Sequence, residues 1–93
     1  MAPQKKGFAT LHIEPDKRNY LGQTLKEIRK ELGLTQAEAA AKLGISQAEW
    51  SVWELGKSKP NFDTILCIAA SLEIHARDLI TRAFRKAGIR DGG

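Results

Sequence analysis

The chain has 93 residues, which is enough for one compact domain and too few for two independent cores. Fifteen Lys and Arg against eleven Asp and Glu give a net charge of +4, which favours a polyanionic partner without identifying it. The single cysteine excludes an intramolecular disulfide and a multi-cysteine metal site, and no run of about 18 apolar residues could span a bilayer. With no apolar run resembling a signal peptide, we expect a cytoplasmic protein without membrane contact.

Residues 1–15 are predicted to form an extended N-terminal arm. Pro3, Gly7 and Pro15 surround one short apolar patch, residues 8–13. The patch has strand length, but a lone strand finds no partner inside a helical domain. The alternatives are a flexible arm, a strand paired across a dimer, and a segment that binds a protein partner.

Two helices are predicted next. Asp16 can cap the first helix, which ends at Gly33. Its apolar face is formed by Leu21, Leu25, Ile28 and Leu32. Thr35, with Glu38 three residues on, has the pattern of a capping box and predicts a second helix over residues 36–43.

The third helix is predicted to begin after Ser46, which again has a glutamate, Glu49, three residues on. Trp50 and Trp53 lie one turn apart on its inner face, and it ends at Gly56.

The last two helices follow a basic turn, residues 57–60. Asn61 can cap the fourth helix, and residues 76–87 form the fifth. The apolar stripe of the fourth helix is formed by Phe62, Ile65, Leu66, Ala69 and Leu72. Cys67 falls beside this stripe and is predicted to be a buried apolar filler. The sequence thus predicts an all-α fold: a compact five-helix bundle over residues 16–87, with the extended arm before it and a disordered tail, residues 88–93, after it.

A sharp corner is predicted between the second and third helices. Two helices can cross at a steep angle only where their backbones approach closely and the chain reverses. Ala40 offers a small side chain at the crossing, Gly44 can adopt a left-handed conformation, and Ile45 fills the corner. These features predict a helix-turn-helix over residues 36–55.

The chain resembles the lambda-repressor-like family, also called the Cro/C1 or Xre type, over residues 21–79. The resemblance rests on Gln36, Ala40, Gly44, Ile45, Trp50, Trp53, Glu54 and Gly56, on the Leu34-Thr35-Gln36 start of the second helix and on Lys59-Pro60 before the fourth. Because these residues occur together in register, the resemblance is specific. It implies a helix-turn-helix that binds double-stranded DNA.

The resemblance also implies roles for individual residues. Gln36 matches a residue that clamps a DNA phosphate, and the lysines of the turn, Lys57 and Lys59, match phosphate contacts. The outward side of the third helix, which matches the base-reading surface in the major groove, carries Gln47, Ala48, Ser51 and Val52, and Ser46 at the start of this helix is also expected to contact DNA. Gln47 is the main candidate because its amide can pair bidentately with adenine. Ordinary surface roles remain the alternative for each residue.

The chain departs from the family pattern at Ala39, where a leucine is usual, and at Trp50, where Ile or Val is usual. We expect Trp50 to be buried near Ala39 and to fill the vacated volume. Arg29 and Glu54 match a family salt bridge with a structural role. The exposed side of the third helix offers few hydrogen-bond donors, which leaves open either modest DNA affinity or a protein partner.

These observations predict a sequence-specific transcriptional regulator, a repressor that reads a palindromic operator as a homodimer through the fifth helix. The alternative is an antitoxin or adaptor whose main partner is a protein, bound through the arm, and which regulates its own promoter. An enzyme is not expected, because His12 and His75 are far apart and neither lies beside a nucleophile or a carboxylate pair. We likewise expect no cofactor, no metal site and a location at the nucleoid.

Overall fold

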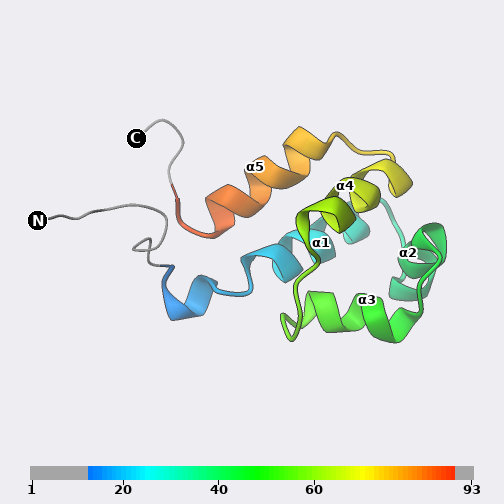
Figure 1. Ribbon diagram of the computed structural model, residues 1–93, viewed down its shortest axis with the longest axis horizontal. Helices are drawn as coiled ribbons and strands as arrows, with labels where there is room; N and C mark the ends of the chain where they lie inside the picture. Colours follow the sequence, from blue (N-terminus) through cyan, green and yellow to red (C-terminus); the bar gives the residue numbers. More distant parts are fainter. Residues whose placement is uncertain (1–12, 90–93) are drawn as a thin grey trace, which may run out of the picture.

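The computed structural model describes residues 13–89, which contain only helices and the connections between them. A short 3-10 helix, Pro15–Lys17, precedes five α-helices (Figure 1). Their bounds are α1 Tyr20–Glu31, α2 Gln36–Leu43, α3 Gln47–Glu54, α4 Phe62–Ser71 and α5 Ala76–Lys86. The predicted all-α, five-helix fold is confirmed. The arm up to residue 12 and the tail from residue 90 lie outside the described residues, so the predicted domain boundaries remain a prediction.

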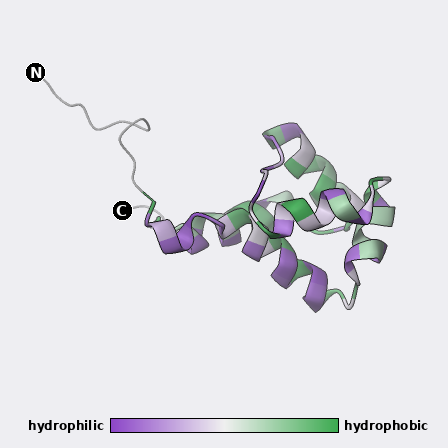
Figure 2. Ribbon diagram, turned by 90° about the horizontal axis from the view of Figure 1, so that it is seen from below, coloured by the Kyte–Doolittle hydropathy of each residue, from purple (hydrophilic) through white to green (hydrophobic). Residues whose placement is uncertain are grey.

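The five helices pack around one apolar core. In Figure 1, α5 runs back alongside α1, while α2 and α3 form a tight pair at the other end of the molecule. The largest buried apolar side chains are Trp50, Leu25, Ile68 and Leu79, so α1, α3, α4 and α5 all contribute to the core. Green and purple residues alternate along the helices in Figure 2, as expected for helices with one buried face.

Both predicted capping boxes are present. The Thr35 side chain accepts from the Glu38 amide, the Ser46 side chain accepts from the Glu49 amide, and each glutamate bonds back to the cap residue. Two residues before Ser46, Gly44 adopts the left-handed conformation at φ 73°, and Ile45 is partly buried against the core. The corner of the helix-turn-helix therefore forms as the sequence predicts.

All five α-helices end in the same hydrogen-bonded motif, in which a residue of positive φ follows the last turn. Four of these residues are glycines, and the fifth is Glu73, at φ 57° after α4. The Ile74 amide donates to the Ala69 carbonyl and the Glu73 amide donates to the Ala70 carbonyl, which defines a Schellman motif. Glu73 thus occupies a backbone conformation that favours glycine.

Two sequence predictions about these elements are wrong. Helix α1 begins at Tyr20 rather than after Asp16, because the Asn19 side chain donates to the Glu54 carbonyl at 2.9 Å and holds the chain in a turn there. Cys67 is exposed rather than buried. Ile68, Ala69 and Leu72 carry the buried face of α4, which turns Cys67 toward solvent.

Candidate nucleic-acid interface

Helix α3, the predicted recognition helix, is anchored by one face and open on the other. Trp50 is fully buried, as expected, and Ala39 is fully buried in the same core. Trp53 packs on the Trp50 ring, with the ring centroids 5.8 Å apart. The opposite face leaves Gln47 and Ala48 exposed, and Ser51 and Val52 half-buried. The four side chains predicted to read bases thus lie together on the solvent side of one rigid helix.

The buried carboxylate of Glu54 links α3 to α1 and α2. It accepts hydrogen bonds from Arg29 Nε at 2.6 Å and from Arg29 Nη2 at 3.1 Å, which confirms the predicted salt bridge. The indole N–H of Trp50 also donates to it, and Gln36 Nε2 donates to Oε1 at 2.9 Å. Arg29 Nη1 additionally donates to the Leu34 carbonyl at 2.9 Å. Each of the two Glu54 oxygens therefore accepts two hydrogen bonds.

These contacts determine how Glu54 ionises. Burial by itself raises the pKa of the Glu54 carboxyl, but the hydrogen bonds from Arg29, Gln36 and Trp50 outweigh burial and hold the pKa below its ordinary value. The pKa of Arg29 is raised by its hydrogen bond to Glu54, against the opposing effect of burial. Both partners are thus charged at neutral pH, and the carboxylate acts only as an acceptor.

Gln36 connects this buried network to the surface. Its amide donates to Glu54, and its Oε1 accepts a long hydrogen bond of 3.4 Å from Gln47 Nε2. The predicted phosphate clamp and the predicted base reader are therefore neighbours. Sequence reasoning missed this connection because the contacts span 18 and 11 residues of chain.

The capping box of α3 engages one further candidate, Ser46. Ser46 Oγ accepts from the Glu49 amide at 3.1 Å, and Glu49 Oε1 accepts from the Ser46 amide at 3.0 Å. The side chain of Ser46 thus serves the helix end. The Glu49 carboxylate is hydrogen-bonded in the same cap, at the start of α3.

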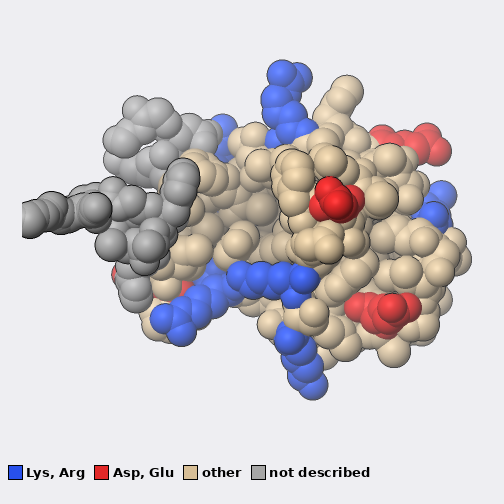
Figure 3. All heavy atoms as spheres, in the orientation of Figure 1, with Lys and Arg blue, Asp and Glu red and all other residues tan. Residues whose placement is uncertain are grey.

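The two candidate lysines lie in the α3–α4 loop, and both are exposed. The Lys59 ammonium sits over the Tyr20 ring, 4.2 Å from its centroid, which places this loop against the start of α1. Figure 3 shows Lys and Arg side chains gathered over the start of α1 and this loop. Lys17 and Arg18, exposed just before α1, add to the basic surface, although no sequence pattern distinguished them from other basic residues.

Among residues 13–89, none of the helices is both long enough and apolar enough to cross a membrane. In the same part of the chain, no group of three or more His, Cys, Asp or Glu side chains is arranged to hold a metal ion.

An anchored recognition helix, reached through a left-handed glycine turn and flanked by basic residues, defines the class of helix-turn-helix DNA-binding proteins. Residues 22–83 match the family described as the helix-turn-helix domain, and the chain belongs to this family. The resemblance to lambda-repressor-like domains is thereby confirmed. The protein is a DNA-binding transcriptional regulator.

Solved structures share this fold. The clp gene regulator ClgR from Corynebacterium glutamicum is 26% identical with a TM-score of 0.68, over 75% of this chain and 91% of that chain. The restriction-modification controller protein C.AhdI from Aeromonas hydrophila is 30% identical with a TM-score of 0.63, over 69% of this chain and 97% of that chain. A second ClgR structure, 24% identical with a TM-score of 0.72 over 81% of this chain and 80% of that chain, supports the fold alone. The matched family and both solved proteins are regulators rather than enzymes. No curated protein sequence matches the chain.

Proposed function

We propose that the protein represses transcription by binding a palindromic operator as a homodimer, with α3 in the major groove. The observation that carries this proposal is the open face of α3, where Gln47 and Ala48 are exposed while Trp50 fixes the helix from behind. The Gln47 amide pairs with the N6 and N7 edge of adenine, and the Ala48 and Val52 methyl groups meet thymine methyls. Ser46 and Ser51 lie at the edge of this contact.

Phosphate contacts position the recognition helix. Gln36 stands at the N-terminus of α2, where free backbone amides and the helix dipole favour a phosphate. Its second amide hydrogen remains available for that phosphate beside the bond to Glu54. Lys57 and Lys59, in the loop after α3, reach the backbone on the other side of the groove. These contacts supply affinity that does not depend on sequence.

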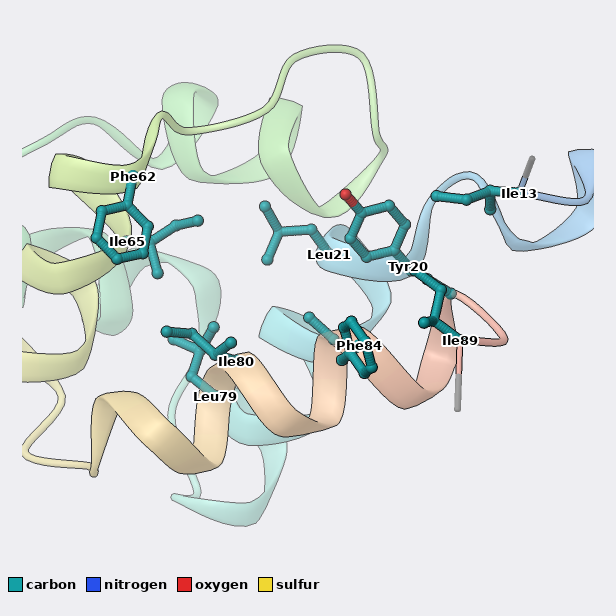
Figure 4. A pocket seen from close by; sticks show the side chains of 11 residues that line it. Ile13, Tyr20, Leu21, Phe62, Ile65, Leu79, Ile80, Phe84 and Ile89 are labelled. Atoms are coloured by element: carbon teal, nitrogen blue, oxygen red, sulfur yellow. The ribbon is translucent and has the colours of Figure 1, made fainter. Parts of the chain in front are cut away.

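The homodimer is proposed to form through α5 and the neighbouring end of α4. An apolar hollow of about 210 Å³ lies between α1, α4 and α5, and Figure 4 shows Phe62 from α4 opposite Ile80, and Tyr20 from α1 opposite Phe84. Phe62 is 60% exposed, Ile80 40% and Phe84 36%. Exposed apolar side chains gathered around a hollow favour an interface. Pairing two copies there would place two recognition helices about one DNA turn, roughly 34 Å, apart.

A repressor of this kind works in the cytoplasm at the nucleoid. A protein partner that binds residues 1–15, as in an antitoxin, is the competing function, and its binding segment lies almost wholly outside the described residues.

Selection of bound fragments from random DNA tests the function directly. We expect a palindromic motif whose affinity falls steeply with salt, because each neutralised phosphate contributes about −0.9 to the logarithmic slope. Absence of any selected motif would favour the protein-partner alternative.

Two substitutions separate base reading from phosphate binding. Gln47→Ala should relax the motif at one base pair in each half-site and weaken binding to the operator by about 1–3 kcal/mol. Lys57→Ala should instead weaken all sequences alike and reduce the salt slope by about one. An unchanged motif for Gln47→Ala would show that another residue reads the bases.

A further inference from the structure

A chain of hydrogen bonds runs from the buried core to the recognition surface with a fixed direction. Glu54 Oε1 accepts from Gln36 Nε2 at 2.9 Å, and Gln36 Oε1 accepts from Gln47 Nε2 at 3.4 Å. We propose that Glu54 determines base specificity without touching DNA, by fixing through Gln36 which way the Gln47 amide points. This inference rests on the proposed function, because it assigns the origin of the Gln47 preference.

The carboxylate sets the direction because it can only accept. An ionised carboxylate has no hydrogen to donate, whereas a glutamine amide has an acceptor at one end and two donors at the other. Gln36 must therefore turn its amino group toward Glu54, which leaves its oxygen toward Gln47. Gln47 in turn must direct its amino group toward Gln36.

The carboxylate itself is buried and bonded on both oxygens. The Glu54 side chain is only 4% exposed, and Arg29 binds both of its oxygens. The indole of Trp50 donates to Oε2, the oxygen that Gln36 does not use. Oε1 is therefore held in one position from which Gln36 takes its orientation. The depressed pKa of Glu54 is consistent with a carboxylate that remains ionised in this position.

A fixed amide reads one order of donor and acceptor. With one amide hydrogen directed to Gln36, Gln47 presents its oxygen and its second hydrogen to the groove. Adenine offers a donor at N6 and an acceptor at N7, which match this pair in one order only. An amide that is free to turn over presents its donor and acceptor in either order, so only part of the population can pair bidentately with adenine and the preference for adenine would fall.

The test is a double-mutant cycle on base preference. Gln36→Met keeps a side chain of similar length and leaves the bridge between Arg29 and Glu54 in place, but it cannot transmit orientation. Glu54→Gln replaces an acceptor by a group that can donate or accept. The full chain, both single variants and the double variant are assayed on the selected operator and on operators changed at the base pair that Gln47→Ala identifies.

We expect the wild-type protein to prefer its own base pair at that position by about tenfold or more, the range of a bidentate contact. The preference should fall at least threefold in Gln36→Met and in Glu54→Gln. In the double variant it should fall no further than in Gln36→Met, because Glu54 acts through Gln36. Lys57→Ala, the matched control, should lower affinity with the preference unchanged.

The proposal is overturned if Gln36→Met lowers affinity equally on all operators, since Gln36 would then contact only phosphate. It is also overturned if Glu54→Gln lowers the preference as much in the Gln36→Met background as in the wild-type background. If Glu54→Gln does not fold, Glu54→Asp, which keeps the charge but withdraws the carboxylate from Gln36, takes its place in the cycle, and circular dichroism verifies the fold of each variant. Failure of the proposed function is distinct, because Gln47→Ala would then identify no base pair.

Discussion

At Gly22 the backbone of α1 lies directly against the end of α3. A Cβ atom at this position would stand 2.4 Å from the Trp53 carbonyl oxygen and 2.7 Å from that of Glu54. Both contacts are backbone atoms, so a side chain could be accommodated only if the two helices moved apart. The absence of a side chain at Gly22 thus allows α1 to support the recognition helix.

We therefore predict that Gly22→Ala lowers the free energy of unfolding by about 1–3 kcal/mol or more, the usual range for overpacking. It should also weaken operator binding, because α3 shifts. Urea unfolding measures the first effect. Gln23→Ala, at the exposed neighbouring position, should stay within about 0.5 kcal/mol of the wild-type protein. Equal stability of both variants would contradict the close packing at Gly22.

The ionised state of Glu54 links stability to pH. Its pKa is lowered in the folded protein from an ordinary value of 4.5, mainly because hydrogen bonds from Arg29, Gln36 and Trp50 outweigh burial, which alone would raise it. The unfolded chain therefore binds more protons than the folded protein in mildly acidic solution. The stabilising contribution is fully present above the unfolded pKa and is lost as the pH falls through the lower, folded pKa.

We expect the free energy of unfolding to decrease between about pH 5.5 and pH 3, and to decrease less steeply in Glu54→Gln. Denaturant titrations across this range measure the slope. Glu31 is a suitable residue for comparison with Glu54. Its hydrogen bond to Arg82 also lowers its pKa, but the Glu31 side chain is exposed whereas that of Glu54 is buried. A slope unchanged by Glu54→Gln would mean that other carboxylates cause the acid sensitivity.

Among the helix ends, that of α4 is the unusual one. Glu73 adopts φ 57° where the other four α-helices have glycine. A left-handed conformation costs a residue with a side chain about 1–2 kcal/mol, which glycine avoids, although glycine loses more entropy on folding. We predict that Glu73→Gly stabilises the protein by about 0.5–1 kcal/mol.

Thermal unfolding should then show a rise in Tm of roughly 2–8 °C for a domain of this size. Glu73→Ala removes the same carboxylate but keeps the side-chain strain, so its Tm should not rise. A gain in both variants would assign the effect to charge instead of backbone conformation.

For the molecule as a whole, the apolar hollow between α1, α4 and α5 carries the dimer prediction. Phe84 lines this hollow and is 36% exposed. Phe84→Asp places a charge at the proposed interface and should shift the protein to the monomer. Relative to the wild-type protein, its affinity should fall more for the two-half-site operator than for a single half-site. Gln23→Asp adds the same charge on α1, outside the hollow, and should leave association unchanged. Light scattering after size exclusion measures the mass, and a wild-type protein that stays monomeric with and without operator would refute the dimer.

The sequence by itself determined the local structure. The capping boxes at Thr35 and Ser46, the left-handed turn at Gly44 and the spacing of apolar residues depend on neighbours within about four residues, so they can be read from the chain. The start of α1 cannot be read from neighbouring residues in this way, because the Asn19 side chain bonds to the Glu54 carbonyl, 35 residues away.

Only the tertiary structure decided how the surface residues are oriented. The family resemblance paired Arg29 with Glu54, but the bonds that Trp50 and Gln36 make to the same carboxylate depend on how three helices meet. The exposure of Cys67 likewise follows from the rotation of α4 against the core. Periodicity identifies that a helix has an apolar face, whereas the packing of all five helices determines which residues that face buries and which it leaves to bind DNA.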